Sequence, residues 1–326
     1  MATKEIRAKL SLPLAVCYTE FHNHSASLGM PSVSADTVET NSRGQSMEMP
    51  EEPFHTESKG AENGVNPFFG EWRQRFRFSP VASTAKPERR QNFRQRIQEA
   101  IGCSFYFTDE VKVEITLHID EQRIRETDQT ADLDNFAKCI LDCLKGKNGI
   151  LIDDCQIQSL HISWIDIYDD NEWFEVEIRG HPDEFLLRDV VLYEMPDKLW
   201  YPLSNHSWDN GEALPVNEVT RLAGPLILEA MTDFSRKLRS KMRATGLSRM
   251  QAYRKSKYHS TGARGFHKSR VEGEFDLVPM KKWKADIAEL SESGDEKAKS
   301  VATLLHEFKE QKAATLSTWE ELYRSR

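Results

Sequence analysis

The chain has few cysteines and lacks both an apolar run long enough for a membrane span and a targeting signal. The five cysteines do not show the paired spacing of a disulfide framework, so we expect a reducing compartment, the cytoplasm. Residues 10–17 are apolar but too short to span a bilayer. Their charged flank contains Glu5, which argues against a secretory signal. We therefore expect no association with membranes.

The charge of the chain is acidic overall but unevenly distributed. The net charge is −8 and the pI about 5.8, values that by themselves argue against nucleic-acid binding. Residues 236–270, however, contain twelve Lys or Arg and no Asp or Glu, interleaved with aromatic residues such as Tyr253. This basic block favours contacts to a DNA or RNA backbone driven by counterion release. The alternatives are a solvated helix face or an intramolecular partner for the acidic N-terminal segment.

A length of 326 residues allows about two domains, and the composition suggests where they divide. Residues 1–65 are rich in Ser, Glu, Thr, Asn and Gly with little periodicity, which predicts a disordered leader. Residues 66–181 alternate strand and helix patterns and form the predicted core domain. Residues 182–326 are predicted to be a mainly helical basic extension. In it, residues 199–203 and 205–211 are interpreted as connecting segments, a helix begins near Val216, and residues 280–326 form a helical hairpin.

The core domain is organised around a cluster of carboxylates. Residues 111–119 alternate apolar and polar side chains, which predicts a strand with one buried face. From Leu133 to Leu144 the apolar residues recur at helical spacing, so Asp132 lies near a helix start. Asp132 could simply cap that helix. Likewise, Asp134 and Lys138 at i, i+4 could be an ordinary surface ion pair.

A second acidic pair, Asp153-Asp154, weakens these simpler interpretations. It follows an apolar run and precedes the alternating residues 156–162, so it occupies a bend between helix and strand. Like charges in a bend beside another acidic cluster are costly unless a cation shares the site. Carboxylates without a Cys/His set favour a hard ion, Mg²⁺ or Mn²⁺.

The remaining core elements are predicted from similar patterns. Residues 72–78 alternate aromatic and basic side chains, typical of an opening strand that could also contact nucleic acid; an edge strand with Arg facing water is the alternative. A basic helix is predicted from Pro87 to about Ile101. Residues 156–167 and 173–179 are predicted to form a closing hairpin with the acidic residues 169–172 as its turn.

The order of these elements resembles the RusA family of Holliday junction resolvases. The motifs are Asp132-x-Asp134-Asn135-x-x-Lys138, Leu141-Asp142-Cys143-Leu144 and Asp153-Asp154-x-Gln156. The resemblance covers roughly residues 75–179 and implies an α+β fold, with a mixed sheet of about four strands packed by two helices. It also implies that Asp132, Asp134 and Asp154 are the metal-binding catalytic carboxylates, that Lys138 is a positioned cation, and that Asp153 is a neighbouring ligand.

This resemblance implies a Mg²⁺-dependent endonuclease, with Mn²⁺ as a substitute, that nicks four-way or branched DNA as a homodimer. A protein that keeps the fold and binds nucleic acid without cutting it is the alternative, and another branched DNA target is a third interpretation. The chain departs from the family in the acidic segment 126–130, where a basic one is usual. The cations expected to contact DNA are Arg75, Arg77, Lys86, Arg89, Arg90, Arg123, Arg125, Arg243, Arg254, Lys255 and Lys257.

Overall fold

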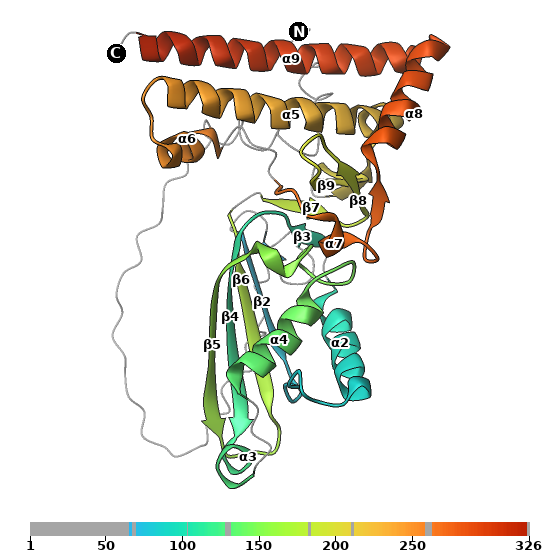
Figure 1. Cartoon of the computed structure of the whole chain (residues 1–326). Coiled ribbons are helices and arrows are strands. Elements are labelled where there is room, and N and C mark those ends of the chain that lie inside the picture. Colours follow the sequence, from blue (N-terminus) through green and yellow to red (C-terminus); the bar gives the residue numbers. More distant parts are fainter. Residues whose placement is uncertain are drawn as a thin grey trace, which may run out of the picture.

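The computed structural model describes residues 65–66, 70–102, 104–127, 132–181, 184–209, 212–257 and 263–324. The predicted leader, residues 1–65, lies outside these ranges except for Val65. Figure 1 shows a tall sheet flanked by two helices in one half of the molecule and long stacked helices in the other. The fold is thus α+β with a mixed sheet, as the sequence predicts.

The main sheet has the strand order β1-β2-β6-β4-β5. In a central strand such as β4, buried side chains alternate with more exposed ones, because only one face of the sheet packs against helices. Strands β4 and β5 run parallel, whereas β6 is antiparallel to both β2 and β4. The strands are β1 (Val65–Asn66), β2 (Glu71–Phe76), β4 (Val111–Asp120), β5 (Ile157–Ile167) and β6 (Trp173–Arg179).

The predicted hairpin between β5 and β6 is wrong. These strands are not neighbours: β6 lies between β2 and β4, and among the described strands β5 pairs with β4 alone, at the edge of the sheet. The helix after β4 returns the chain to the other end of the sheet, so β5 must run parallel to β4. Strand β6 then takes the central position because Phe174, Val176 and Ile178 are fully buried there, whereas β5 exposes most of its side chains.

Two helices cover one face of this sheet and form its core. They are α2 (Pro87–Ile101), which matches the predicted basic helix, and α4 (Leu133–Leu144) (Figure 1). Ile97, Ile140 and Leu144 are fully buried against the strands, and burial of each such side chain contributes about 1.5–3 kcal/mol. Because these apolar residues recur at helical spacing, the opposite stripe of α4 is left facing solvent.

Short elements connect this core to the rest. Helix α3 (Glu121–Glu126) follows β4, and the 3-10 helix η3 (Asp154–Gln156) precedes β5. Strands β3 (Phe105–Phe107) and β7 (Phe185–Leu187) pair in a two-stranded sheet at the end of the main sheet where β5 begins.

The C-terminal half contains more strand than the sequence predicts. Trp200, Tyr201 and Leu203 of the expected connection are buried in β9 (Trp200–Ser204), which pairs with β8 (Val190–Glu194). The second expected connection contains β10 (His206–Asp209), which forms a hairpin with β11 (Glu212–Pro215) just after it. Strand β12 (Asp276–Val278) joins β8 in parallel. The segment could not be recognised locally because the β8–β12 pairing joins residues far apart in the chain.

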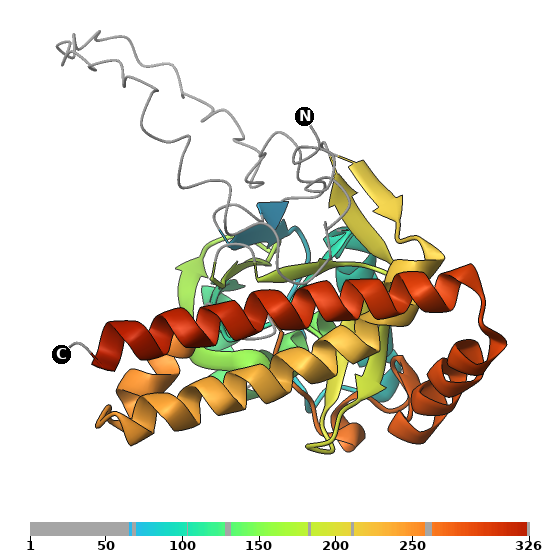
Figure 2. The same cartoon turned by 90° about the horizontal axis from the view of Figure 1, so that it is seen from above.

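The extension is helical where the sequence predicts it, but the predicted hairpin does not form. Helix α5 (Glu218–Ala244) begins close to Val216, and α8 (Met280–Ser293) is followed by α9 (Glu296–Arg324), which α8 meets at a steep angle (Figure 1). Helix α9 lies along α5 (Figures 1 and 2), and Ile227, Met231, Val301 and Phe308 form the buried seam between them. The shorter helices are α6 (Arg249–Ser256) and α7 (Lys268–Val271).

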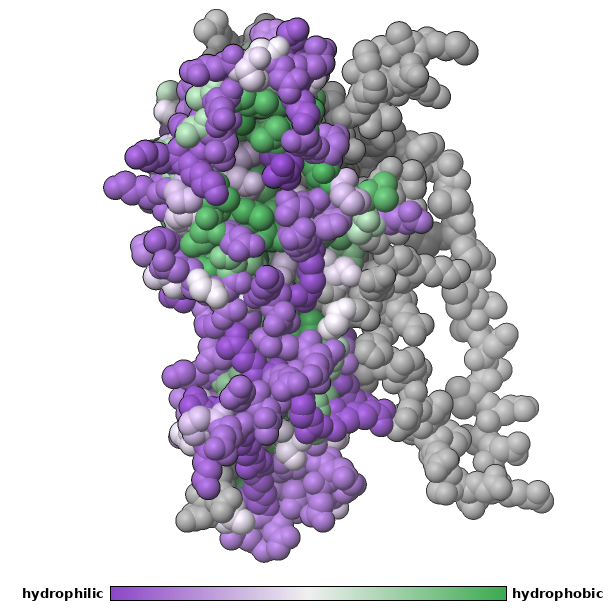
Figure 3. Space-filling view, turned by 90° about the vertical axis from the view of Figure 1, so that its right-hand side faces the viewer, coloured by the Kyte–Doolittle hydropathy of each residue, from purple (hydrophilic) through white to green (hydrophobic). Residues whose placement is uncertain are grey.

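The two halves also differ at the surface. Figure 3 shows one face on which apolar side chains gather in the half that contains the C-terminal helices, while hydrophilic side chains cover the half that contains the main sheet. Among the helices that the structure describes, none combines the length and the apolar character that a membrane crossing requires.

Candidate functional site

The first turn of α4 presents two carboxylates to solvent. Asp132 is the residue before the helix, with extended backbone, but its side chain makes no capping hydrogen bond. Asp132, Asp134 and Lys138 are exposed, and none has an ion pair or side-chain hydrogen bond within the described part of the chain. The simpler interpretations, a cap and a surface pair, are therefore not what the geometry shows.

The loop after β2 holds this turn in place. The Ser83 hydroxyl donates a hydrogen bond to Asn135 Oδ1 at 2.8 Å, and the Ser83 amide donates to the Asn135 carbonyl at 2.9 Å. On the inner side, Phe136 and Ala137 are buried. Asn135 of the motif is thus structural, and it fixes the turn from which Asp132 and Asp134 project.

The second acidic pair lies on a rigid bend. Asp153 is 3 % exposed, and its carboxylate accepts a hydrogen bond from the Cys155 amide at 2.9 Å. Gln156 is fully buried; its Oε1 accepts from the Ile152 and Asp153 amides at 2.8 and 3.1 Å. Its Nε2 donates to the Phe107 carbonyl at 2.8 Å. Gln156, conspicuous in the motif but without a predicted role, is the residue that shapes the bend.

Two cations neutralise Asp154. Lys145 Nζ lies 2.7 Å from Asp154 Oδ2, and Arg270 Nη1 lies 3.0 Å from Oδ1 and 3.6 Å from Asp153 Oδ1. Arg264 of the same segment as Arg270 donates to the Cys155 carbonyl at 2.7 Å. Both oxygens of Asp154 are therefore engaged, and a metal ion there would have to share or displace these cations.

Sequence reasoning missed both residues. Lys145 had a local signal, because it lies i, i+3 from Asp142, and their side chains are 2.9 Å apart. Arg270 had none beyond its place in the basic block, since it comes from α7 in the extension.

The two acidic pairs lie at opposite ends of α4. Lys145 contacts both Asp154 and Asp142, and Asp142 lies eight residues, roughly 12 Å along the helix axis, from Asp134. Carboxylates that share one Mg²⁺ each lie about 2 Å from it. Across the described ranges, no three His, Cys, Asp or Glu side chains are grouped closely enough to hold a metal ion. The structure brings Asp153 and Asp154 together, but it separates them from Asp132 and Asp134.

A basic aromatic cleft lies at the end of the sheet where α4 begins. It has a volume of about 540 Å³, and its lining contains three arginines, two aromatic residues and two acids: Arg75, Arg77, Arg96, Phe78, Trp173, Asp170 and Glu172. The Arg75 guanidinium stacks over Trp173 at 4.2 Å and pairs with Glu175 at 3.0 Å. Arg96 stacks over Phe78 at 3.9 Å, and Arg77 is exposed. Arg75 and Arg77, predicted to contact DNA, thus line the same cleft.

His118 forms part of the support beneath this cleft. Its ring stacks on Trp173 with 3.4 Å between the centroids. Burial, followed by the positive charge of Arg75, lowers the pKa of His118 to about 4. The imidazole is therefore neutral near pH 7 and adds no charge to the cleft.

The other predicted DNA-contacting cations fall into two groups. Some are paired within the chain: Arg123 with buried Glu172, Arg125 with Glu121 and Asp166, and Lys257 with Glu184. Exposed cations are Lys86, Arg89 and Arg90 at the start of α2, Arg243 on α5, and Arg254 and Lys255 on α6; Lys255 also has an interaction within the chain. The sequence does not show which of these cations form ion pairs with Glu172, Asp166 or Glu184, because those acidic partners are distant along the chain.

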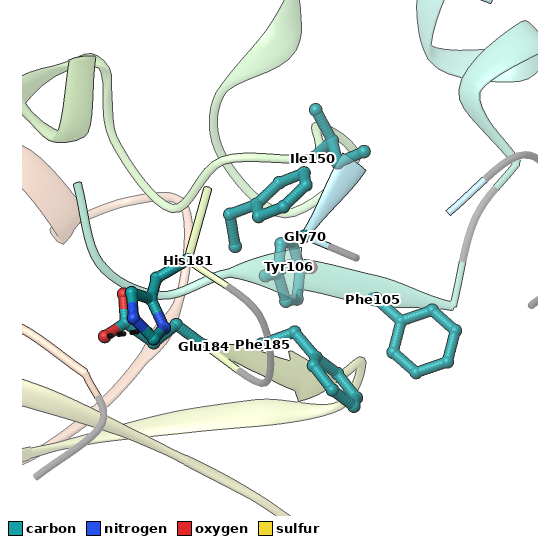
Figure 4. A pocket seen from close by; sticks show the side chains of 8 residues that line it. Gly70, Phe105, Tyr106, Ile150, His181, Glu184 and Phe185 are labelled. Atoms are coloured by element: carbon teal, nitrogen blue, oxygen red, sulfur yellow. Dashed lines mark ion pairs between the residues drawn. The ribbon is translucent and has the colours of Figure 1, made fainter. Parts of the chain in front are cut away.

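An aromatic pocket near β3 and β7 is not a ligand site. Figure 4 shows Phe105, Tyr106 and Phe185 converging on it, with His181 and Glu184 paired at its side. The space accessible to water inside it is about 0 Å³, so the rings fill it. Burial, and then the nearby charge of Asp109, raises the pKa of Glu184.

Comparison with known families agrees with the motif. The family model described as Endodeoxyribonuclease RusA matches residues 68–179, close to the range over which the motifs extend. No curated protein matches the chain. The match contains β2 to β6, both acidic pairs and the basic aromatic cleft. Residues 68–179 therefore match a RusA endodeoxyribonuclease domain, which supports a nuclease of the kind that acts on Holliday junctions.

Proposed function

We propose that the protein is a metal-dependent, structure-selective endonuclease that nicks four-way or branched DNA. The observation that carries this proposal is the pair of exposed, unpartnered carboxylates on the first turn of α4 beside a cleft of arginine and tryptophan side chains. Unpaired acids next to a phosphate-binding surface repel DNA unless a cation accompanies the substrate. In a nuclease domain such a pair of carboxylates can hold a catalytic metal ion, whereas in a protein that only binds DNA it would weaken binding by repulsion.

The donor set has the chemistry of a magnesium site but is divided in space. Asp132, Asp134 and Asp154 would hold the ion through carboxylate oxygens, with Asp153 beside them. A bound Mg²⁺ would supply an activated water and charge stabilisation for phosphodiester hydrolysis. Lys138, one turn after Asp134 on the same exposed stripe, would offset phosphate charge, and Arg75 and Arg77 would hold the neighbouring phosphates.

We further propose that two copies of the chain complete the site. The acids of one chain are separated by most of the length of α4, and this separation supports a second chain as the source of the missing group. A four-way junction also presents two equivalent strands, which suits a two-fold symmetric dimer.

The edge strand β5 is the best candidate for the contact between copies. It is eleven residues long, roughly 36 Å, and exposes Leu160 (43 %), Trp164 (45 %) and Ile165 (50 %). An apolar edge of this length with no partner strand among the described residues invites pairing with another strand. Identical edges related by a two-fold axis run antiparallel, so the start of β5 in one copy faces its end in the other. Asp153 and Asp154 precede β5, whereas its end lies where α4 begins, so this pairing brings Asp154 of one chain toward Asp134 of the other.

The primary test is cleavage of a labelled synthetic four-way junction and a linear duplex of matched sequence, with Mg²⁺ or EDTA. We expect nicking confined to the junction, absent in EDTA and lost in Asp134→Asn. Asp233→Asn, the same isosteric change at an exposed acid on α5, should cut normally. Loss of activity in both variants would contradict the assignment of Asp134.

The shared site is tested by mixing two inactive variants. If each site combines Asp134 of one chain with Asp154 of the other, a heterodimer of Asp134→Asn and Asp154→Asn regains one intact site and nicks one strand. If each site belongs to a single chain, the mixture stays inactive. Trp164→Glu should shift the protein from dimer to monomer in light scattering, and an unchanged dimer would rule out β5 as the interface.

A binding protein without nuclease activity is the second candidate. The engagement of both Asp154 oxygens by Lys145 and Arg270 favours it, because that geometry neutralises the bend without a metal. Equal, tight junction binding by the native protein and Asp134→Asn, with no nicking in Mg²⁺ or Mn²⁺, would support this candidate.

A further inference from the structure

A second basic cleft lies between α5 and α6, outside the residues that match the nuclease family. It has a volume of about 780 Å³ and lies in the helical half of the molecule, apart from α4 (Figure 1). None of the lining residues within the described part of the chain is acidic. The lining residues are Arg236, Arg239, Ser240, Arg243, Ala244, Leu247, Ser248, Arg249 and Tyr253.

The arginines of this cleft are arranged on one side of α5 and at the start of α6. Arg236, Arg239 and Arg243 are spaced at i, i+3 and i+7, which places them on one helix face. Arg236 is paired with Asp197 at 2.8 Å. Within the described residues, Arg239, Arg243 and Arg249 have no acidic partner. Like charges at i, i+4 destabilise a helix by a few tenths of a kcal/mol, so Arg239 and Arg243 carry a cost that a bound anion would relieve.

An exposed aromatic ring lies among these charges. Tyr253 is 53 % exposed, and the guanidinium groups of Arg239 and Arg249 lie 4.9 and 5.9 Å from the centre of its ring. An accessible ring flanked by cations is typical of surfaces that bind single strands, where an unstacked base lies on the aromatic face. A duplex offers phosphates but hides its base faces, so the ring would have no role in binding it.

We propose that the α5–α6 cleft binds an unpaired nucleic-acid strand. Arg239, Arg243 and Arg249 contact its phosphates, and one base stacks on Tyr253. This site adds a single-stranded segment to the branched DNA substrate of the proposed nuclease. Only that link to the substrate rests on the proposed function; binding of a strand to the cleft does not. The strand chemistry is common to DNA and RNA, and the test distinguishes them.

The test measures binding in EDTA, where no cleavage occurs. Fluorescence anisotropy of the full-length chain is recorded with a labelled 15-nucleotide DNA strand, the same strand as RNA, and the matching duplex. The variant Arg239→Gln/Arg243→Gln is compared with Lys281→Gln/Lys282→Gln, which removes the same charge from exposed positions on α8.

We expect the arginine variant to bind the single strand at least tenfold more weakly, and the lysine variant to bind within about twofold of the native protein. The salt dependence should also change: each lost phosphate contact lowers the slope of log K against log salt by about 0.7. Equal losses in both variants, or tighter binding of the duplex than of the single strand, would overturn the proposal. Whichever of the DNA and RNA strands binds more tightly is the kind of nucleic acid that the cleft recognises.

The stacking contact has its own test. Tyr253→Ala should weaken single-strand binding about fivefold or more, while Tyr253→Phe should retain it, because a base stacked on an aromatic ring contributes about 1–3 kcal/mol. Thermal melting confirms that both variants are folded. Native affinity in Tyr253→Ala would refute the stacking contact. If the native protein cuts no junction but these variants lose strand binding, the proposed nuclease function is refuted and the proposed strand-binding cleft is supported.

Discussion

Replacing Gln156 with Leu should destabilise the nuclease domain by about 4 kcal/mol. The buried amide makes four hydrogen bonds: it accepts from the Ile152 and Asp153 amides and donates to the Phe107 and Asp109 carbonyls. Leu keeps the volume but leaves four backbone groups without this partner, and each such group costs about 1–3 kcal/mol when it stays buried. The burial of a Leu side chain offsets about 2 kcal/mol of the total.

The control for this change is two residues further along the chain, in β5. Gln158 is exposed and bonds only to Glu110, at 3.2 Å, so Gln158→Leu should change stability by no more than about 0.5 kcal/mol. Urea unfolding of both variants, followed by tryptophan fluorescence, provides the comparison. If Gln156→Leu loses less than 1 kcal/mol beyond Gln158→Leu, then the amide does not hold the bend. Junction cleavage should fall in Gln156→Leu as well, because Asp153 and Asp154 lie on that bend.

Three further changes follow from the geometry of the domain. Gly149→Ala should cost about 2 kcal/mol or more, because the new Cβ would lie 2.2 Å from the Leu144 carbonyl oxygen; denaturant unfolding measures the loss. Arg123→Ala should cost about 2 kcal/mol by the same assay, since it leaves the buried Glu172 carboxylate without its cation. His118 is neutral in the folded state because burial lowers its pKa to about 4, whereas the unfolded chain binds a proton below pH 6.5. Stability should therefore fall between pH 6.5 and 4, and His118→Phe should flatten this slope in melting curves recorded across that range.

Each of these changes has a control or a contrary outcome. Gly224→Ala in α5 meets only the end of a flexible Leu203 side chain at 3.1 Å and should be nearly neutral. Arg125→Ala removes the ion pairs of an exposed guanidinium with Glu121 and Asp166 and should cost less than about 1 kcal/mol. A loss in either control equal to that of its partner variant would contradict the structural reason given. An unchanged pH slope in His118→Phe would mean that other groups set the acid sensitivity.

The sequence was sufficient to predict the strands and helices whose formation depends on the pattern of consecutive residues. Alternation in β4 and helical spacing in α4 depend on which side chains face the core, and those periods are visible in consecutive residues. The motif placed Asp132 and Asp134 at a helix start and Asp153 and Asp154 in a bend for the same reason. It also identified the nuclease family, which the family comparison then confirmed.

Strand pairing and ion pairing were decided only by the tertiary structure. The predicted hairpin of β5 and β6 failed because β6 buries its apolar face in the centre of the sheet, a position set by β2 and β4 and not by its neighbour in sequence. The pairing of Arg123 with Glu172, 49 residues further along the chain, has no signal in the sequence. Arg270 reaches Asp154 from 116 residues away. Periodicity shows which face of a helix or strand is buried, but it carries no information about which distant residue lies against that face. For this reason, only the folded chain showed that the two acidic pairs lie at opposite ends of α4.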